Sequence, residues 1–346
     1  MTTVFVYEHV TTSGARGQSL APSLLAEGRA MRDAVIADFA AVPDVSVQTV
    51  PDGGEAHFRK AAANADYALI IAPETDGILE ERCRWALDSK ARLLGPSLDA
   101  IRLTADKLAL AEHLMRAGVP HPRTWALGDE PHDLFPIVWK PRDGAGSQST
   151  YLVSPQRQQG SFADSGSPQR QQGRYAATLA GAAGSELTHL LNQWMIAQEY
   201  SAGSAASVAF LVGPSERVAL LPCHQHISDD GFLRYLGGSL PFADDLSVRA
   251  IALARKAIGC VPGLFGYVGV DLVLADDPAR DCIIEINPRL TTSYVGLRRA
   301  AQFNIAEALL QVVRGKKLPN LPWLPDRILF LPDGSNLPAE KSTFSS

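Results

Sequence analysis

The stretch GYVGVDLVLADDPARDCIIEIN, residues 266–287, contains two runs of alternating apolar side chains on either side of a polar turn. Side chains along a strand point alternately to opposite faces, so this pattern predicts a β-hairpin. If the turn at 276–280 closes symmetrically, position 275 lies opposite 281, and Asp271 lies opposite Glu285. Asn287 then shares the face of Glu285.

Two carboxylates that face each other across a sheet repel, unless a cation lies between them. The oxygen atoms of Asp271, Glu285 and Asn287 are ligands that Mg²⁺ accepts, usually together with substrate phosphates. The plainer alternative is that these side chains are solvated on the wet face of a half-buried sheet. The hairpin alone favours neither interpretation.

Two lysines outside the hairpin favour the metal and phosphate interpretation. Lys140 ends a predicted strand and is followed by the glycine-rich loop 143–147, while Lys107 lies in a predicted helix that Thr104 caps. Such a loop lets backbone N–H groups approach phosphate oxygens, and the lysine adds a point charge. A lone lysine is usually a surface residue, and the loop matches neither a Rossmann fingerprint nor a Walker loop.

Outward from this region, strand and helix patterns alternate over the first hundred residues, which predicts a parallel sheet covered on both faces. We therefore expect an α/β chain with an N-terminal open parallel-sheet domain over 1–100, an α+β module over 101–318 and a proline-rich tail over 319–346. The repeat SPQRQQG at 154–160 and 167–173 marks a low-complexity insert, 154–173. Further helices are expected over 174–192, 244–258 and 295–314.

Composition limits the classes of function. The chain has 346 residues, of which 46% are hydrophobic and 20% charged, with a net charge of −5. This balance excludes general disorder and argues against a nucleic-acid binder. No apolar run approaches the ~18 residues of a membrane span. The N-terminus does not resemble a signal peptide, and four scattered cysteines favour a reducing, cytoplasmic location.

Five stretches together resemble the ATP-grasp superfamily of carboxylate–amine ligases: LTADKLAL (103–110), VWKPRDGAGS (138–147), AQEYSAG (197–203), GYVGVDLV (266–273) and IEINPRL (284–290). The resemblance implies a pre-ATP-grasp domain followed by an ATP-grasp module. It implies a ligase that uses ATP and Mg²⁺, with Mn²⁺ as an alternative metal. Its partners would be a small-molecule carboxylate and an amine, joined through an acyl phosphate, with no nucleic acid or membrane. A homodimer is left open.

Carried over residue by residue, the resemblance implies phosphate contacts from Lys107, Lys140, Gly144, Gly146 and Ser147, adenine contacts from Gln198, Glu199 and Tyr200, and metal ligation by Asp271, Glu285 and Asn287. Arg289 would contact the transferred phosphate or the acyl intermediate, so Arg289 and Lys140 are the expected catalytic residues. Two departures exist. Segment 203–207 has no carboxylate for ribose, and no arginine directly precedes Asp271.

Three shorter stretches, GARG (14–17), LLAEGRAM (24–31) and IAPETDGIL (71–79), look like the tyramine–L-glutamate ligase family of methanofuran biosynthesis. That family makes γ-glutamyltyramine. Arg298 could then hold the α-carboxylate of glutamate, and Glu74 and Asp76 could meet a cationic amine. The plainer alternatives are a solvated helix start for Arg298 and helix N-terminal charge for the two carboxylates.

Two other functions stay open on the sequence alone. One is an ATP-grasp ligase for another amino-acid and amine pair, and the other is a non-catalytic nucleotide-binding protein. The combination of Lys107 and Lys140 with the three oxygen-bearing side chains of the hairpin favours an enzyme. His224 and His226 share a strand face, but no third metal ligand is evident nearby.

Overall fold

The computed structural model describes residues 1–13, 22–131, 133–144, 149–154 and 194–335. Several expectations fall outside these ranges. They are the roles of Gly146 and Ser147, nearly all of the insert 154–173, the helix over 174–192 and the last part of the tail.

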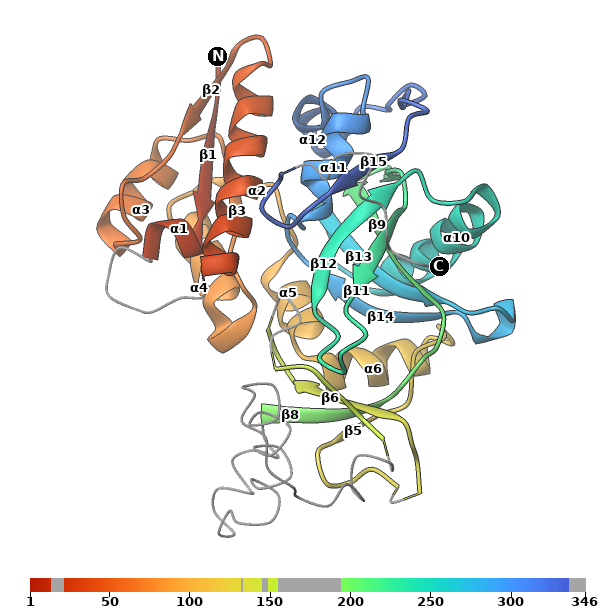
Figure 1. Ribbon diagram of the computed structural model, residues 1–346. Helices are drawn as coiled ribbons and strands as arrows, with labels where there is room; N and C mark the ends of the chain where they lie inside the picture. Colours follow the sequence, from red (N-terminus) through yellow and green to blue (C-terminus); the bar gives the residue numbers. More distant parts are fainter. Residues whose placement is uncertain (14–21, 132, 145–148, 155–193, 336–346) are drawn as a thin grey trace.

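The first domain is a four-stranded parallel sheet in the order β2-β1-β3-β4, drawn in red to orange in Figure 1. Its elements are β1 (Thr2–Glu8), α1 (His9–Ser13), α2 (Pro22–Ala40), β2 (Val45–Gln48), α3 (Glu55–Ala63), β3 (Tyr67–Ile71), the 3₁₀ turn η2 (Thr75–Gly77), α4 (Ile78–Asp88) and β4 (Arg92–Leu93). Side chains of β1 alternate between two cores, because Val4 and Val6 pack with α2 whereas Phe5 and Tyr7 pack with α3 and α4. The expected doubly covered parallel sheet is confirmed, and α3 is an element that the sequence patterns missed.

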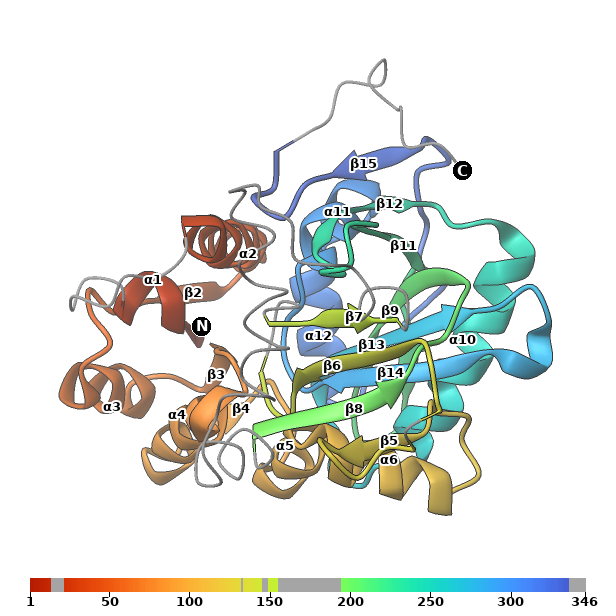
Figure 2. The same cartoon turned by 60° about the horizontal axis from the view of Figure 1, so that its bottom comes forward.

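The second domain contains two antiparallel sheets. The small sheet, in the order β5-β8-β6-β7, consists of β5 (Thr124–Ala126), β6 (Ile137–Pro141), β7 (Tyr151–Val153) and β8 (Met195–Glu199). The large sheet, in the order β14-β13-β9-β11-β12-β15 with β10 on β9, consists of β9 (Ser204–Val212), β10 (Arg217–Ala219), β11 (Cys223–Ile227), β12 (Tyr235–Leu240), β13 (Gly266–Leu274), β14 (Cys282–Asn287) and β15 (Ile328–Phe330). Figure 2 shows the small sheet in front of β13 and β14.

The helices of this domain are α5 (Leu98–Ala105), α6 (Lys107–Arg116), α10 (Asp244–Cys260), α11 (Ser293–Ala300) and α12 (Ile305–Val313); the 3₁₀ turn η3 (Pro278–Arg280) lies between β13 and β14. The helix expected to start at Thr104 begins at Lys107 as α6, and Thr104 belongs to the separate helix α5. Asp106 separates them, because its carboxylate accepts the N–H groups of Leu108 and Ala109, each at 3.1 Å. The helix expected over 295–314 also divides, and the Asn304 side chain caps α12 at its start.

The hairpin of β13 and β14 contains a β-bulge. Asp271 pairs with Glu285 as expected, but Leu272 pairs with Ile283, so Ile284 has no partner across the ladder. The turn therefore does not close symmetrically. The extra residue of the bulge shifts the register by one, so that Asp271 still pairs with Glu285. A bulge also places two successive side chains on one face. Ile284 and Glu285 accordingly both line the same cavity.

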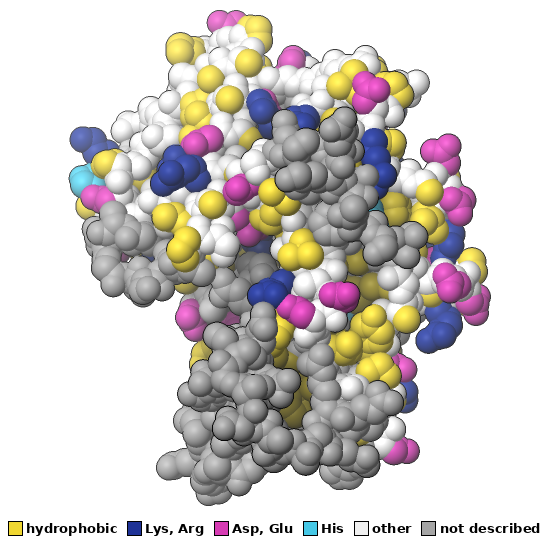
Figure 3. Space-filling view, viewed as in Figure 1, with side chains coloured by type: hydrophobic (Ala, Val, Ile, Leu, Met, Phe, Trp, Pro, Cys, Tyr) yellow, Lys and Arg dark blue, Asp and Glu magenta, His cyan; other side chains and the backbone are white. Residues whose placement is uncertain are grey.

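On the face shown in Figure 3, acidic and basic side chains of the described residues are interspersed. Among the described helices, none is long and apolar enough to cross a membrane.

Candidate active site

A cavity of about 600 Å³ lies between the first domain and the two sheets of the second. Of the residues predicted for the site, it is lined by Asp76, Lys107, Lys140, Gly144, Gln198, Glu199, Tyr200, Asp271, Glu285, Asn287 and Arg289. Glu74 and Arg298 are not among its lining residues. Segments more than 200 positions apart therefore meet around one space.

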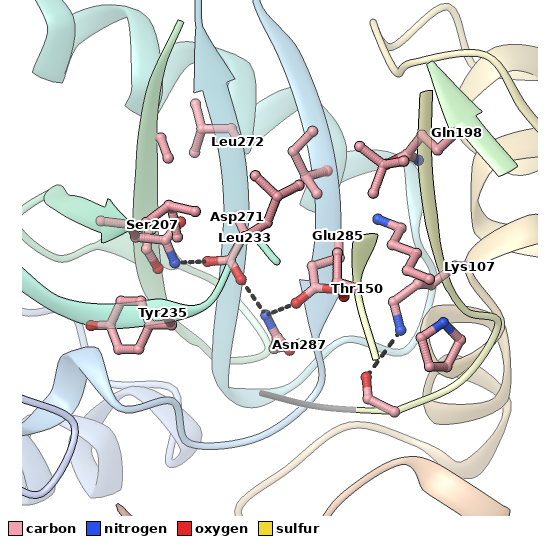
Figure 4. Close-up of a pocket in the computed structure, with 18 of the residues that line it drawn as sticks. Lys107, Thr150, Gln198, Ser207, Leu233, Tyr235, Asp271, Leu272, Glu285 and Asn287 are labelled. Carbon is pink, nitrogen blue, oxygen red and sulfur yellow. Dashed lines mark hydrogen bonds between the residues drawn. The ribbon is translucent and has the colours of Figure 1, made fainter. Parts of the chain in front are cut away.

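The carboxylates of Asp271 and Glu285 stand side by side on neighbouring strands, with the Asn287 amide between them (Figure 4). The amide nitrogen of Asn287 lies 3.0 Å from an oxygen of Asp271 and 3.4 Å from one of Glu285. Gln225 donates a further bond of 3.0 Å to Asp271. Burial, reinforced by the Glu285 carboxylate, raises the pKa of Asp271, whereas Lys107 and Lys140 outweigh burial and hold the pKa of Glu285 low.

The donor set of Asp271, Glu285 and Asn287 fits a hard divalent cation. Two adjacent buried carboxylates carry negative charge that a cation would neutralise, and the amide oxygen of Asn287 is a third ligand of the same hardness. Among the described residues, no group of three or more histidine, cysteine, aspartate and glutamate side chains could hold a metal ion. These three residues thus suit a cation that shares its ligands with a substrate, as Mg²⁺ does with phosphates.

Lys107 and Lys140 reach the cavity from two elements. Asp106 fixes the start of α6 and so sets the position of Lys107, whose Nζ lies 3.0 Å from the carbonyl oxygen of Gly144. Lys140, near the end of β6, is only 6% exposed. Burial lowers its pKa to about 8, although Glu285 opposes this shift, and the charge of Lys107 lowers it further. Two lysine side chains that line one cavity suit the binding of an anion.

The loop after β6 touches the first domain. Asp143 accepts the backbone N–H of Asp76 at 3.0 Å. Gly144 adopts φ +117°, and a Cβ atom there would lie 3.2 Å from the Thr75 hydroxyl. Glycine meets both requirements, namely the left-handed backbone and the close approach.

The end of β8, which pairs with β6, also lines the cavity. Gln198 is 3% exposed and donates a bond of 3.0 Å to the Thr124 hydroxyl, so its amide has a fixed orientation. The Glu199 carboxylate pairs with the exposed Arg123 at 2.9 Å. This pairing directs the carboxylate of Glu199 toward the surface, while the residue itself still lines the cavity.

Arg289 follows β14 and makes a buried ion pair with Glu74 of the first domain. Its Nε and Nη2 atoms lie 2.9 and 3.2 Å from the two oxygens of Glu74. The side chains are 10% and 4% exposed. Although burial opposes it, the charge of Glu74 raises the pKa of Arg289. Glu74, expected to meet an amine, is therefore occupied by Arg289.

Arg298 makes a second ion pair between the domains, away from the cavity. Its guanidinium group contacts Asp38 of α2 at 2.7 Å and 3.1 Å, and the Tyr294 hydroxyl donates a bond of 2.7 Å to the same carboxylate. The Arg298 side chain is 34% exposed. This placement does not suit the expected role in holding a substrate carboxylate.

Several polar residues of the cavity were not predicted: Glu27, Ser207, Gln225 and Tyr235. Gln225 lies between His224 and His226, and strand alternation places it on the opposite face from both histidines. The two histidines instead pack beside Phe242 and Ser239. The same alternation of side chains along β11, which puts both histidines on one face, could therefore have indicated that Gln225 lies on the opposite face, which lines the cavity. Glu27 lies in the stretch LLAEGRAM (24–31), which carried the narrower family resemblance, but nothing in that stretch marked it as a residue of the site.

Comparison with known proteins gives the same architecture. The pre-ATP-grasp 3 domain family matches residues 30–101, and the ATP-grasp domain family matches residues 174–293. A tyramine–L-glutamate ligase of Methanocaldococcus fervens is 29% identical over 253 residues, which cover 73% of this chain and 68% of that protein. The enzyme of the same name from Methanocaldococcus jannaschii is 27% identical over 74% of this chain and 65% of its own length.

Comparison with solved structures gives the same fold. A protein of Archaeoglobus fulgidus assigned to the ATP-grasp superfamily has a TM-score of 0.69 and 26% identity, covering 96% of this chain and 92% of that one. Carboxyaminoimidazole ribonucleotide synthase of Aspergillus clavatus, solved with ATP, has a TM-score of 0.64 at 17% identity and covers 95% and 81%, which shows a shared fold. The chain therefore has a pre-ATP-grasp domain followed by an ATP-grasp domain, and is a ligase that forms amide bonds.

Proposed function

We propose that the protein joins L-glutamate to tyramine, with ATP as the energy source, and forms γ-glutamyltyramine for a methanofuran-type cofactor. The proposal rests on one observation, the convergence of Lys107, Lys140 and Arg289 with the carboxylate pair in a single cavity between the two domains. The names of the two Methanocaldococcus relatives support the choice of substrates.

The first step is attack of the substrate carboxylate on the γ-phosphorus of ATP. A new O–P bond forms, the bond from the γ-phosphorus to the bridging oxygen breaks, and ADP leaves. Lys107 and Lys140 would bind phosphate oxygens, and the buried position of Lys140 strengthens this attraction. Arg289, oriented by Glu74, would bind the transferred phosphoryl group.

Asp271, Glu285 and Asn287 would hold Mg²⁺, which when bound supplies positive charge beside the phosphates. The bonds of Gln225 and Asn287 to Asp271 hold its carboxylate in place before the nucleotide arrives. Gln198, Glu199 and Tyr200 would border the adenine at the other side of the cavity.

The second step is attack of the amine nitrogen on the carbonyl carbon of the acyl phosphate. The amine reacts in its neutral form, so its ammonium group first loses a proton to solvent. The C–N bond then forms, the C–O bond to phosphate breaks, and the proton lost from nitrogen leaves with the phosphate as hydrogen phosphate. No protein nucleophile is needed, so the contribution of the chain is orientation and charge, and exclusion of water from the acyl phosphate.

An ADP-release assay with purified protein, ATP, Mg²⁺, L-glutamate and tyramine tests the proposal, and mass spectrometry identifies which carboxyl group is joined. We expect ADP release that requires both substrates and a product with the mass of γ-glutamyltyramine. Aspartate in place of glutamate is the matched control. ADP release with a different acid and amine would overturn the substrates alone, whereas ATP binding without turnover for any pair would favour a non-catalytic nucleotide-binding protein.

A further inference from the structure

Glu27 is one of the carboxylates of the cavity that have no part in the steps described above. Glu27 lies in the second turn of α2, in the first domain, and lines the cavity beside Thr292 and Ser293. The Thr292 hydroxyl donates a hydrogen bond to Glu27, which fixes one of its two carboxylate oxygens. The site thus contains an oriented acidic group contributed by the pre-ATP-grasp domain.

Glu27 lines the same cavity as Arg289, Asp271 and Glu285. Thr292, whose hydroxyl binds Glu27, follows Arg289 closely in the chain, and the charge of Glu27 helps to raise the pKa of Arg289. A group bound at Glu27 would therefore be close to a phosphoryl group held by Arg289.

Among the described residues, the surroundings of Glu27 are short of positive charge. Burial raises its pKa, and the nearby Glu8 raises it further, while Thr292 and Arg289 act in the opposite direction. Arg289 already makes two bonds to Glu74. Glu8 comes close because α2 carries a glycine at position 28, where a Cβ atom would lie 2.8 Å from a Glu8 oxygen. Glu8, Glu27 and Glu74 thus outnumber the single guanidinium group, and a bound cation would offset the excess.

Asp76 is the other acidic candidate for the amine, but its environment is different. Its backbone N–H is bonded to Asp143, and the adjacent Thr75 lies against Gly144 in the glycine-rich loop. This places Asp76 beside the loop that approaches the phosphates. Asp76 would therefore lie next to the nucleotide phosphates and not in the space left for the amine, so Glu27 is the better-placed partner.

We propose that Glu27 binds the ammonium group of the amine substrate and makes the enzyme selective for a cationic amine. This inference rests on the proposed function, because it requires an amine acceptor and an acyl phosphate. Glu27 is a specificity-determining residue in this proposal: it binds the amine as its ammonium ion near the acyl carbon, the ion then loses a proton to solvent, and the neutral nitrogen attacks.

The test compares two nucleophiles in the variant Glu27→Gln, which keeps an oxygen for the Thr292 hydroxyl and removes the charge. Tyramine is cationic at neutral pH, whereas hydroxylamine is small and neutral and traps an acyl phosphate as a hydroxamate. We expect the KM for tyramine to rise about 10–100-fold, the loss of one charged hydrogen bond. The loss in amide formation should exceed the loss in hydroxamate formation by about tenfold or more.

Asp76→Asn is the matched control, and thermal melting of both variants monitors folding. An equal loss of amide and hydroxamate formation in Glu27→Gln, an unchanged KM for tyramine, or a rise in KM confined to Asp76→Asn would each overturn the role of Glu27. If the wild-type protein forms neither hydroxamate nor amide from glutamate, the proposed substrates fail instead. The two failures are therefore distinguishable.

Discussion

Arg289 and Arg298 lie nine positions apart, and each pairs with a carboxylate of the first domain through two nitrogen atoms. The pair of Arg289 with Glu74 is buried and borders the cavity, whereas the pair of Arg298 with Asp38 is partly exposed and lies away from it. The two ion pairs are thus chemically similar but have different roles. One pair orients a cation that borders the cavity, and the other fastens the domains together.

The difference lies in what surrounds each guanidinium group. Arg289 is close enough to Glu285 and Glu27 for their charges to raise its pKa, so its position is coupled to the acidic groups of the cavity. Arg298 instead shares Asp38 with the Tyr294 hydroxyl, next to the core of α2. An arginine in a sequence motif therefore acquires its role from its neighbours.

The largest expected effect is on catalytic activity, and it distinguishes Arg289 from Arg298. Arg289→Lys should lower kcat/KM by about 10²–10³-fold, because an ammonium group cannot reproduce two directed contacts to a developing anion. ADP release measures this loss, with Arg298→Lys as the matched control. If both variants lose activity equally, the distinction between the two pairs is wrong.

A second comparison concerns stability. Glu74→Gln should lower the free energy of unfolding by about 3 kcal/mol, because it leaves the buried charge of Arg289 without its partner. Urea unfolding followed by tryptophan fluorescence measures the change. A decrease no larger than that of Asp38→Asn would contradict the argument from burial.

Lys140 adds a cation that, unlike the two arginines, titrates near neutral pH. With a pKa of about 8, it is mostly charged at pH 7 and mostly neutral at pH 9. Nucleotide phosphates prefer the charged form, so the affinity for ATP in the absence of acid and amine should fall about tenfold between these pH values. Calorimetric titration measures the dissociation constant. The variant Lys140→Ala should bind weakly at both values, and a wild-type affinity that rises with pH would contradict the prediction.

The smallest expected effect belongs to the pair of Asp38 with Arg298, whose guanidinium group is more exposed than that of Arg289. Asp38→Asn should lower the free energy of unfolding by about 1 kcal/mol, since solvent weakens a partly exposed ion pair. Turnover should stay within about twofold of wild type, because Asp38 does not line the cavity. Urea unfolding and ADP release are compared on the same preparation. A large loss of turnover without a loss of stability would place Asp38 in the site.

Sequence patterns predicted the parts of the fold that depend on local alternation. The parallel sheet and strand β13 followed from runs of apolar residues. The break at Asp106 was missed, because a helix cap inside a continuous helical pattern becomes visible only through its bonds to Leu108 and Ala109. Strand β12, with its two adjacent glycines, was also missed, because its pairing with β11 and β15 outweighs a poor strand propensity.

The site was predictable where one element carries several of its residues. Strand geometry sufficed to put Asp271 opposite Glu285, although the symmetric turn assumed for it was wrong. Contacts between distant segments were not predictable. The pairing of Arg289 with Glu74 spans 215 positions, and that of Arg298 with Asp38 spans 260. No local pattern encodes which carboxylate an arginine will meet.

The extra residue in β14 has a consequence for how related chains are recognised. Ile284 has no partner in the ladder, and removing it would leave a regular hairpin in which Asp271 still faces Glu285. The spacing between these carboxylates along the chain can therefore differ by one without moving them apart in space. A motif search with a fixed interval would overlook such a chain, whereas a structural superposition would recover it.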